Sequence, residues 1–185
     1  MLAPLRTRFD ALETQRVAFL APLYALNEAD RARKPSLKAW SLNELVHHLI
    51  LIDTQARDDL RRALAAPARS AGTTASLRYG LLRRVLALPV RIPAPPAADG
   101  VMPRDTPDFA TLDTMWSDVR ADMAALLATA SPDRHDAAAF RHPIMGRFTL
   151  LDTLDFVHTH HAHHLPQRKR LLAWCSEEPS EASAT

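Results

Sequence analysis

The sequence predicts an all-α fold in which four main helices form a four-helix bundle. Three observations support this prediction. Apolar residues recur every three or four positions in four long stretches, which is the period of a helix buried on one side. Two of these stretches open with a capping box, a local signal for a helix N-terminus. Little of the remaining sequence alternates in the manner of a β-strand.

The first helix is expected between about Pro4 and Leu20. Pro22 ends or kinks it, because a proline ring is incompatible with a helix interior. A short helical turn at about 27–33 follows, before Pro35. The stripe of the first helix that is expected to face the core consists of Leu5, Phe9, Leu12, Arg16 and Phe19 or Leu20.

The second helix begins after Ser41 and continues to about Ala66. The Ser41 hydroxyl can accept a hydrogen bond from the N–H of Glu44, whose carboxylate can accept one from the N–H of Ser41. Trp40 precedes this capping box and Leu45 follows it, which is the arrangement of a hydrophobic staple.

The middle of the chain predicts a long crossover between two helix pairs. A shorter helix at 77–88 is followed by six prolines within 89–107, a composition typical of an extended connection. The next helix is expected to start with Pro107 at its first position and to end at about Thr129. A single turn then follows at 131–133.

A short extended or hairpin segment is predicted at 140–148, directly before the last helix. Thr149 and Asp152 have the spacing of a second, weaker capping box, and the last helix then runs to about Trp174.

Composition indicates one domain at 1–175 and a disordered acidic tail at 176–185, in a chain of 185 residues that is 47% hydrophobic. The single cysteine, Cys175, excludes an internal disulfide. No run of eighteen apolar residues and no signal-peptide pattern occurs, so we expect no membrane partner and a cytoplasmic location.

One basic segment keeps a nucleic-acid partner under consideration. Eight arginines lie between Arg57 and Arg91, against only Asp58 and Asp59. However, the net charge of the chain is only +2, and Tyr79 is the one aromatic residue in the segment. A nucleic-acid partner is therefore not expected.

Five of the nine histidines fall within residues 158–164. Residues four apart on a helix are neighbours on one face. Two imidazoles placed in this way can converge on one divalent ion, at about 2.0–2.1 Å for each Zn–N bond. Spacing leaves four pairings open: His158/His161, His160/His163, His160/His164 and His161/His164.

A metal site needs at least a third ligand from elsewhere in the fold. His47 and His48 lie on the second helix, whereas His135 and His142 lie in loop-like sequence. A helix-borne ligand makes the more rigid site and is favoured. His48 falls at the edge of the apolar stripe, while His47 is predicted to point more nearly outward.

Three short motifs occur in order along the chain. They are Trp40-Ser41-x-x-Glu44-x-x-x-His48, His142-Pro143-x-x-Gly146, and His160-x-x-x-His164-x-x-Gln167. Together they resemble the signature of the DinB/YfiT-like metal-binding four-helix bundles, over roughly residues 5–174. The resemblance implies that His48, His160 and His164 bind a divalent metal ion.

Three neutral imidazoles leave at least one coordination position open, which is typical of a catalytic rather than a structural site. A metal held there could acidify a bound water or thiol, or polarise a carbonyl. The resemblance implies zinc or nickel, and a transferase that uses a low-molecular-weight thiol such as bacillithiol or mycothiol on a small-molecule substrate. Nearby arginines could bind the carboxylates of the thiol: Arg57, Arg61, Arg78, Arg83 and Arg84.

The alternative function is a non-enzymatic one, as a metal-binding, nucleic-acid or protein interaction module. The apolar residues on the faces of the predicted helices also indicate an exposed apolar stripe that a homodimer would cover.

Pro166 stands where the family often has glycine, which predicts a kink and leaves the direction of Gln167 open.

Other candidate residues have simpler explanations. Glu44 is a weak candidate for an outer base, since its capping role already accounts for it. Cys175 has no electropositive neighbourhood in the sequence and is expected to be inert. His142 is expected to be a turn residue. The remaining histidines of the cluster are expected to pack or to lie at the surface, with a supporting role open to one of them: His158, His161 and His163.

Overall fold

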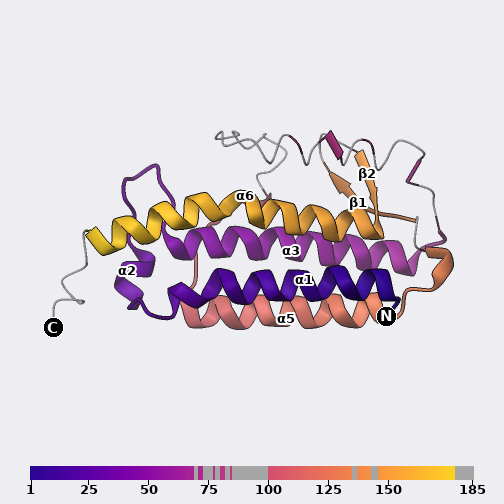
Figure 1. The fold of residues 1–185 in the computed structure, drawn as a ribbon, viewed down its shortest axis with the longest axis horizontal. Coiled ribbons are helices and arrows are strands. Elements are labelled where there is room, and N and C mark those ends of the chain that lie inside the picture. Colours follow the sequence, from indigo (N-terminus) through magenta and orange to yellow (C-terminus); the bar gives the residue numbers. More distant parts are fainter. Residues whose placement is uncertain are drawn as a thin grey trace.

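The fold was determined as a computed structural model, which describes residues 1–68, 71–72, 77, 80–81, 84, 100–134, 137–142 and 146–177. Four long helices lie side by side (Figure 1). They are α1 (Ala3–Leu20), α3 (Leu42–Ala65), α5 (Phe109–Ala128) and α6 (Leu150–Glu177). The prediction of an all-α fold is confirmed.

Short elements connect the long helices. A 3₁₀ turn, η1 (Ala21–Leu23), contains Pro22, and α2 (Glu28–Ala32) is capped by the Asn27 side chain. After α5 come another 3₁₀ turn, η3 (Pro132–Arg134), and an antiparallel hairpin of β1 (Ala138–His142) and β2 (Gly146–Thr149). The predicted short turns and hairpin are therefore present.

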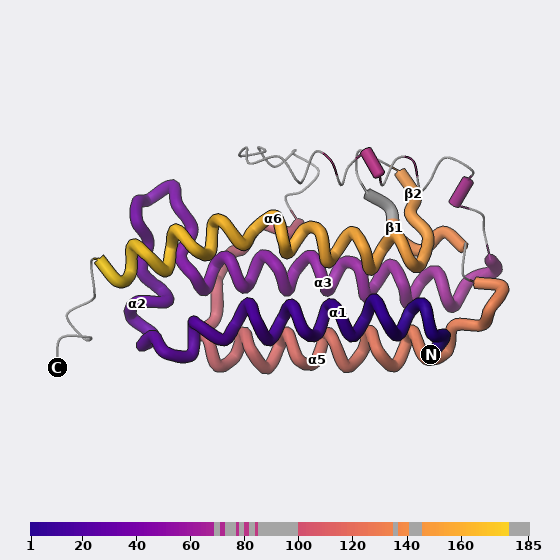
Figure 2. Tube along the Cα trace, viewed as in Figure 1, coloured from indigo at the N-terminus to yellow at the C-terminus, as the bar shows by residue number. Residues whose placement is uncertain are grey.

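The helices run in two directions. α1 and α6 run one way, and α3 and α5 run the other way (Figure 2). Because α3 and α5 are parallel neighbours, the chain must return along their length between residues 66 and 108. This return agrees with the predicted crossover. Most of the helix predicted at 77–88 and the residues 85–99 lie outside the described part of the chain.

Both predicted capping boxes form. The Glu44 N–H donates to the Ser41 hydroxyl at 3.1 Å, and the Ser41 N–H donates to the Glu44 carboxylate at 2.9 Å. At the start of α6, the corresponding bonds of Thr149 and Asp152 measure 3.1 and 3.4 Å. These bonds satisfy backbone donors that the first turn of a helix leaves unpaired.

Two helix ends differ from the sequence prediction. Pro107 is not the first residue of α5, because Asp108 is the N-cap and accepts a hydrogen bond from the Thr111 N–H at 2.8 Å. A carboxylate satisfies a free N–H of the first turn, which proline cannot do. At the other end of the chain α6 continues through Pro166 to Glu177, three residues beyond Trp174.

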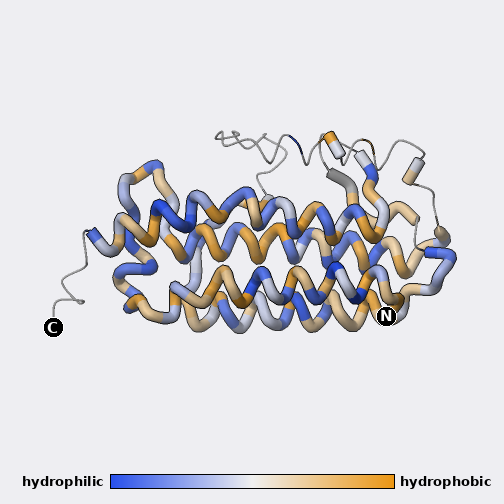
Figure 3. The backbone as a smooth tube through the Cα atoms, viewed as in Figure 1, coloured by the Kyte–Doolittle hydropathy of each residue, from blue (hydrophilic) through white to orange (hydrophobic). Residues whose placement is uncertain are grey.

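Hydrophobic and hydrophilic residues alternate along all four long helices (Figure 3), and the apolar residues form one core between them. In α1 the predicted stripe is buried except at Arg16, which forms ion pairs with Glu13 and Asp113 instead. The hairpin covers α6 with Phe140 and Phe148, whose rings lie 5.1 and 5.9 Å from that of Phe156.

Candidate metal centre

Two antiparallel neighbours, α3 and α6, supply the three predicted ligands. His48 lies in the second turn of α3, seven residues after the Ser41 cap fixes the start of that helix. His160 and His164 lie one turn apart on α6 and therefore face the same side. The pairing His160/His164 is thus the one that meets α3.

The three imidazoles converge. One ring nitrogen from each of His48, His160 and His164 lies within 4.8 Å of the other two. The Nε2 atoms of His48 and His160 are 3.1 Å apart, and the three ring centroids are separated by 4.9–5.2 Å. Within the described residues, no other three histidine, cysteine or acidic side chains meet in this way.

Hydrogen bonds on the far side of two rings determine which ring nitrogen carries the proton. His48 Nδ1 lies 2.7 Å from the carbonyl oxygen of Val101, and His164 Nδ1 lies 2.9 Å from Oε1 of Gln167. Both partners only accept, so each Nδ1 carries the proton and each Nε2 has its lone pair free. Such outer partners orient metal-binding histidines in proteins of known function.

The environment keeps the cluster uncharged. Burial lowers the pKa of His48 to about 4 and that of His164 to about 3. Burial and the neighbouring His164 and His48 hold the pKa of His160 well below its usual range. At neutral pH all three rings are therefore neutral, which is the protonation state that a metal ligand requires.

Aromatic side chains enclose the cluster. The Trp40 ring lies 4.9 Å from that of His48 and stacks at 6.3 Å on that of His164, while Phe156 lies 5.7 Å from His160. His48 is buried, but His160 and His164 keep partial exposure to solvent. The donor set fits a divalent cation such as zinc or nickel, because neutral imidazoles are preferred ligands of both.

A family model of the DinB superfamily matches residues 11–167 of the chain. The chain belongs to the DinB superfamily. The match includes His48, His160 and His164, and it confirms the resemblance noted from the three sequence motifs. A comparison with curated proteins finds no match.

His47 is placed differently from the prediction. It is buried rather than outward-facing, because residues 100–106 cover this part of α3 and Thr106 lies 3.2 Å from His47 Nδ1. This DinB superfamily chain therefore buries both consecutive histidines of α3, but only His48 joins the metal-site cluster.

The other histidines of α6 have separate surroundings. His158 is exposed, and His163 is half-buried with its ring against that of His164. His161 is almost fully buried and binds Asp53 at 3.0 Å. Of the two histidines predicted in loop-like sequence, His135 lies outside the described part of the structure. His142 is not a turn residue but the last residue of β1, paired with Gly146, and its side chain is not described.

The remaining sequence candidates have structural partners. Glu44 caps α3 and also binds Lys34. Cys175 is buried, and its thiol donates to the carbonyl of Asp30 at 3.5 Å. Gln167, whose direction the sequence left open beside Pro166, reaches back to His164.

The basic segment is partly neutralised where the structure describes it. Arg57 and Arg61 both bind Asp58 and Asp122, and Arg62 binds Asp59. Arg78 and Arg83 lie outside the described residues. These ion pairs reduce the positive charge that a polyanion would meet.

A hollow of about 340 Å³ is lined by residues of α3 and by Gly100 and Val101, but by none of the three histidines. Its wall includes Leu51, Gln55 and Arg62, which continue the face of α3 that carries His48. Its other wall includes Val101, the residue whose carbonyl binds His48.

No helix of the described chain is long and apolar enough to cross a membrane.

Proposed function

We propose that this chain is a divalent-metal-dependent enzyme that transfers a low-molecular-weight thiol of the bacillithiol type to a small electrophile. Its metal, zinc or nickel, would be held by His48, His160 and His164. The observation that carries the proposal is the convergence of three neutral imidazoles whose nitrogens lie within 4.8 Å of one another. Membership of the DinB superfamily supports it.

The protein's own groups prepare the site. A divalent cation bound there would supply Lewis acidity, which lowers the pKa of a thiol or water beside it. The Val101 carbonyl and Gln167 Oε1 keep the protons of His48 and His164 on Nδ1, so that the Nε2 lone pairs stay available. Trp40 and Phe156 exclude water from the sides of the cluster.

The hollow along α3, which shares Val101 with the surroundings of His48, supports a small-molecule substrate. Leu51 and Val101 offer apolar contact, Gln55 offers an amide, and Arg62, which is paired with Asp59, has further guanidinium donors for a carboxylate. In the proposed reaction the thiol gives up its proton, its sulfur forms a bond to the electrophilic carbon, and the leaving group departs with its electron pair. A thiol that carries carboxylates is thus the favoured class.

Metal content tests the site. We expect near one equivalent of metal in untagged wild-type protein by elemental analysis, and a loss of it in His48→Ala, His160→Ala and His164→Ala. His158→Ala is the matched control, because His158 lies on the same helix but is exposed. Metal that persists in the three variants, or that never binds wild type, would rule out this ligand set.

Thiol consumption tests the reaction. Metal-loaded protein is mixed with a panel of low-molecular-weight thiols and a generic electrophile, and the free thiol is followed with time. We expect consumption that stops in His160→Ala and after chelation. No turnover by fully metal-loaded wild type with any of the thiols would favour the alternative, a non-enzymatic metal-binding module.

A further inference from the structure

A second polar cluster lies in the core, next to the histidine site but separate from it. Asp53 of α3 accepts hydrogen bonds from Trp116 of α5 at 2.5 Å and from His161 of α6 at 3.0 Å. Arg120 of α5 forms an ion pair with the same carboxylate at 2.8 Å. All four side chains are at most 2% exposed. We call these four residues the Asp53 cluster.

Stability does not explain this cluster. Removing a carboxylate and a guanidinium from water is costly, and apolar residues of similar volume often give an equally stable or more stable core. Burial raises the pKa of Asp53, but the charge of Arg120 and the contacts with His161 outweigh it, so that the pKa lies below its usual value. Asp53 is therefore ionised: it accepts charge-assisted hydrogen bonds from Trp116 and His161 and forms an ion pair with Arg120.

Two of the three helices that form the Asp53 cluster, α3 and α6, also carry the histidine site. His160 and His161 are consecutive, so their side chains leave α6 about 100° apart. One ring meets His48 and the other meets Asp53. On α3, His48 and Asp53 are five residues apart, or about 7.5 Å along the axis. Two polar contacts at different positions along the helix axis therefore fix both the axial position and the rotation of α6 relative to α3.

A metal site tolerates smaller displacements of its ligands than the packing of two helices does. Metal–ligand distances hold to about 0.2 Å, whereas packed helices shift by about 1–2 Å between states. Apolar cores lose their unique packing before they lose stability. A purely apolar contact between α3 and α6 would therefore leave the spacing of His48, His160 and His164 less well defined than a cation requires.

We infer that the Asp53 cluster is a positioning device, which holds α6 in the register that brings His160 and His164 to His48. The inference rests on the proposed function, since the site is the metal centre described above. Asp53, Trp116, Arg120 and His161 are positioning residues, because they act on the ligands through the two helices rather than by touching a substrate.

An apolar variant separates positioning from stability. It combines Asp53→Leu, Trp116→Phe, Arg120→Met and His161→Leu, so that the four residues of the cluster lose their partners together. Glu13, which lies 3.6 Å from Arg120, keeps its ion pair with Arg16. We expect this variant to unfold cooperatively at no lower temperature than wild type, yet to bind zinc at least about tenfold more weakly, as losses around metal ligands commonly do. A structural role alone would leave affinity unchanged in a fully folded variant.

A second readout needs no metal. Imidazole ¹⁵N spectra of the metal-free protein report the tautomer of each histidine. We expect His160 of wild type to show one tautomer, protonated at Nε2 and donating to His48 of α3, and to become averaged in the apolar variant. If wild type binds no metal, the proposed function fails, and these spectra still decide whether the Asp53 cluster sets the register.

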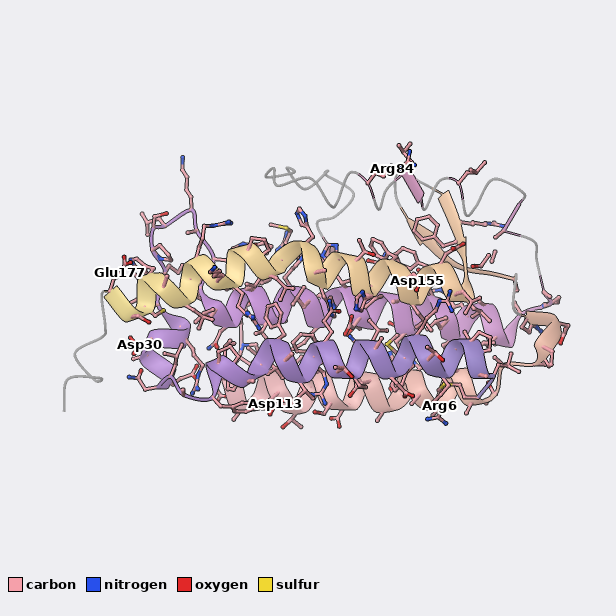
Figure 4. The ribbon with its side chains drawn as sticks, viewed as in Figure 1. Arg6, Asp30, Arg84, Asp113, Asp155 and Glu177 are labelled. Carbon is pink, nitrogen blue, oxygen red and sulfur yellow. The ribbon has the colours of Figure 1, made fainter. Side chains whose placement is uncertain are left out.

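A single substitution covers the case in which the apolar variant does not fold. Asp53→Asn keeps the size of the side chain but removes its charge, and we expect weaker zinc binding and averaged tautomers. Asp155→Asn is the control, because Asp155 also links α6 to another helix, through Arg8 at 3.0 Å, but at the half-exposed surface (Figure 4). Wild-type zinc affinity and unchanged tautomers in a folded Asp53 variant would overturn the inference.

Discussion

The Nε2 atoms of His48 and His160 lie 3.1 Å apart, although 112 residues separate them in the chain. Because the Nδ1 proton of His48 is donated to Val101, the Nε2 of His48 can only accept. In the metal-free protein the contact is therefore a hydrogen bond donated by His160. A cation would take both lone pairs, so binding requires His160 to carry its proton on Nδ1.

The metal-free protein is expected to lose stability in acid below pH 6.5. Unfolded histidines take up protons near pH 6.5, whereas burial holds the pKa of His48 at about 4 and that of His164 at about 3. Between these values the unfolded state binds more protons, so stability falls as the pH falls. For His48 the loss is roughly 3 kcal/mol between pH 6.5 and 4.

Urea unfolding in the presence of a chelator, from pH 7.5 to 4.5, measures this effect. The variant His48→Asn should show a shallower loss because it lacks one of the buried groups. His158→Asn, at an exposed position of the same helix, should follow wild type. A wild-type free energy of unfolding that stays constant from pH 7 to 5 would contradict the prediction.

Replacing Gln167 with leucine should weaken zinc binding by about 10- to 100-fold. The substitution removes the acceptor that keeps the His164 proton on Nδ1. Competition with a chromophoric chelator measures the affinity. Gln167→Glu retains an acceptor oxygen and is expected to stay close to wild type; equal weakening in both variants would argue against this hydrogen bond.

Ser41→Ala should lower the free energy of unfolding by about 1 kcal/mol, because it leaves a backbone donor of α3 without its cap. Glu44→Gln should change stability little, since glutamine can accept the same bond from the Ser41 N–H. If Glu44 is a cap rather than a base, Glu44→Gln should also leave the rate of the proposed thiol transfer unchanged. A rate loss at unchanged stability would give Glu44 a chemical role.

Cys175 should react slowly with a thiol-specific reagent in the native protein. Its side chain is 3% exposed, and burial, followed by the charge of Asp30, raises its pKa, so little thiolate is present at pH 8. We expect modification on the order of 100-fold slower than in denaturant. Rapid labelling of the folded protein would show that the end of α6 opens readily.

Local signals in the sequence were sufficient to predict where α3 and α6 begin. Ser41 with Glu44 and Thr149 with Asp152 each define an N-terminus within four residues, so no distant contact is needed. The same reasoning placed Pro107 wrongly, because two neighbouring residues could both begin α5 and only the geometry of Asp108 decides.

Long-range packing set the limits of the sequence prediction. His47 was predicted to point outward because helix periodicity cannot include residues 100–106, which cover it. The role of Asp53 was missed, although a signal existed. It lies four residues after Leu49 and three before Ala56, so an acidic residue stands within the apolar stripe of α3. Arg120 stands similarly between Trp116 and Met123 in α5.

The order of the ligands along the chain has a consequence for synthesis. His48 leaves the ribosome early, but its two partners lie on the last helix, more than a hundred residues later. During most of translation the nascent chain therefore carries only one of the three imidazoles of the cluster. All three could bind a cation only after nearly the whole polypeptide has been released, and a product that stops before α6 would lack two of the three ligands.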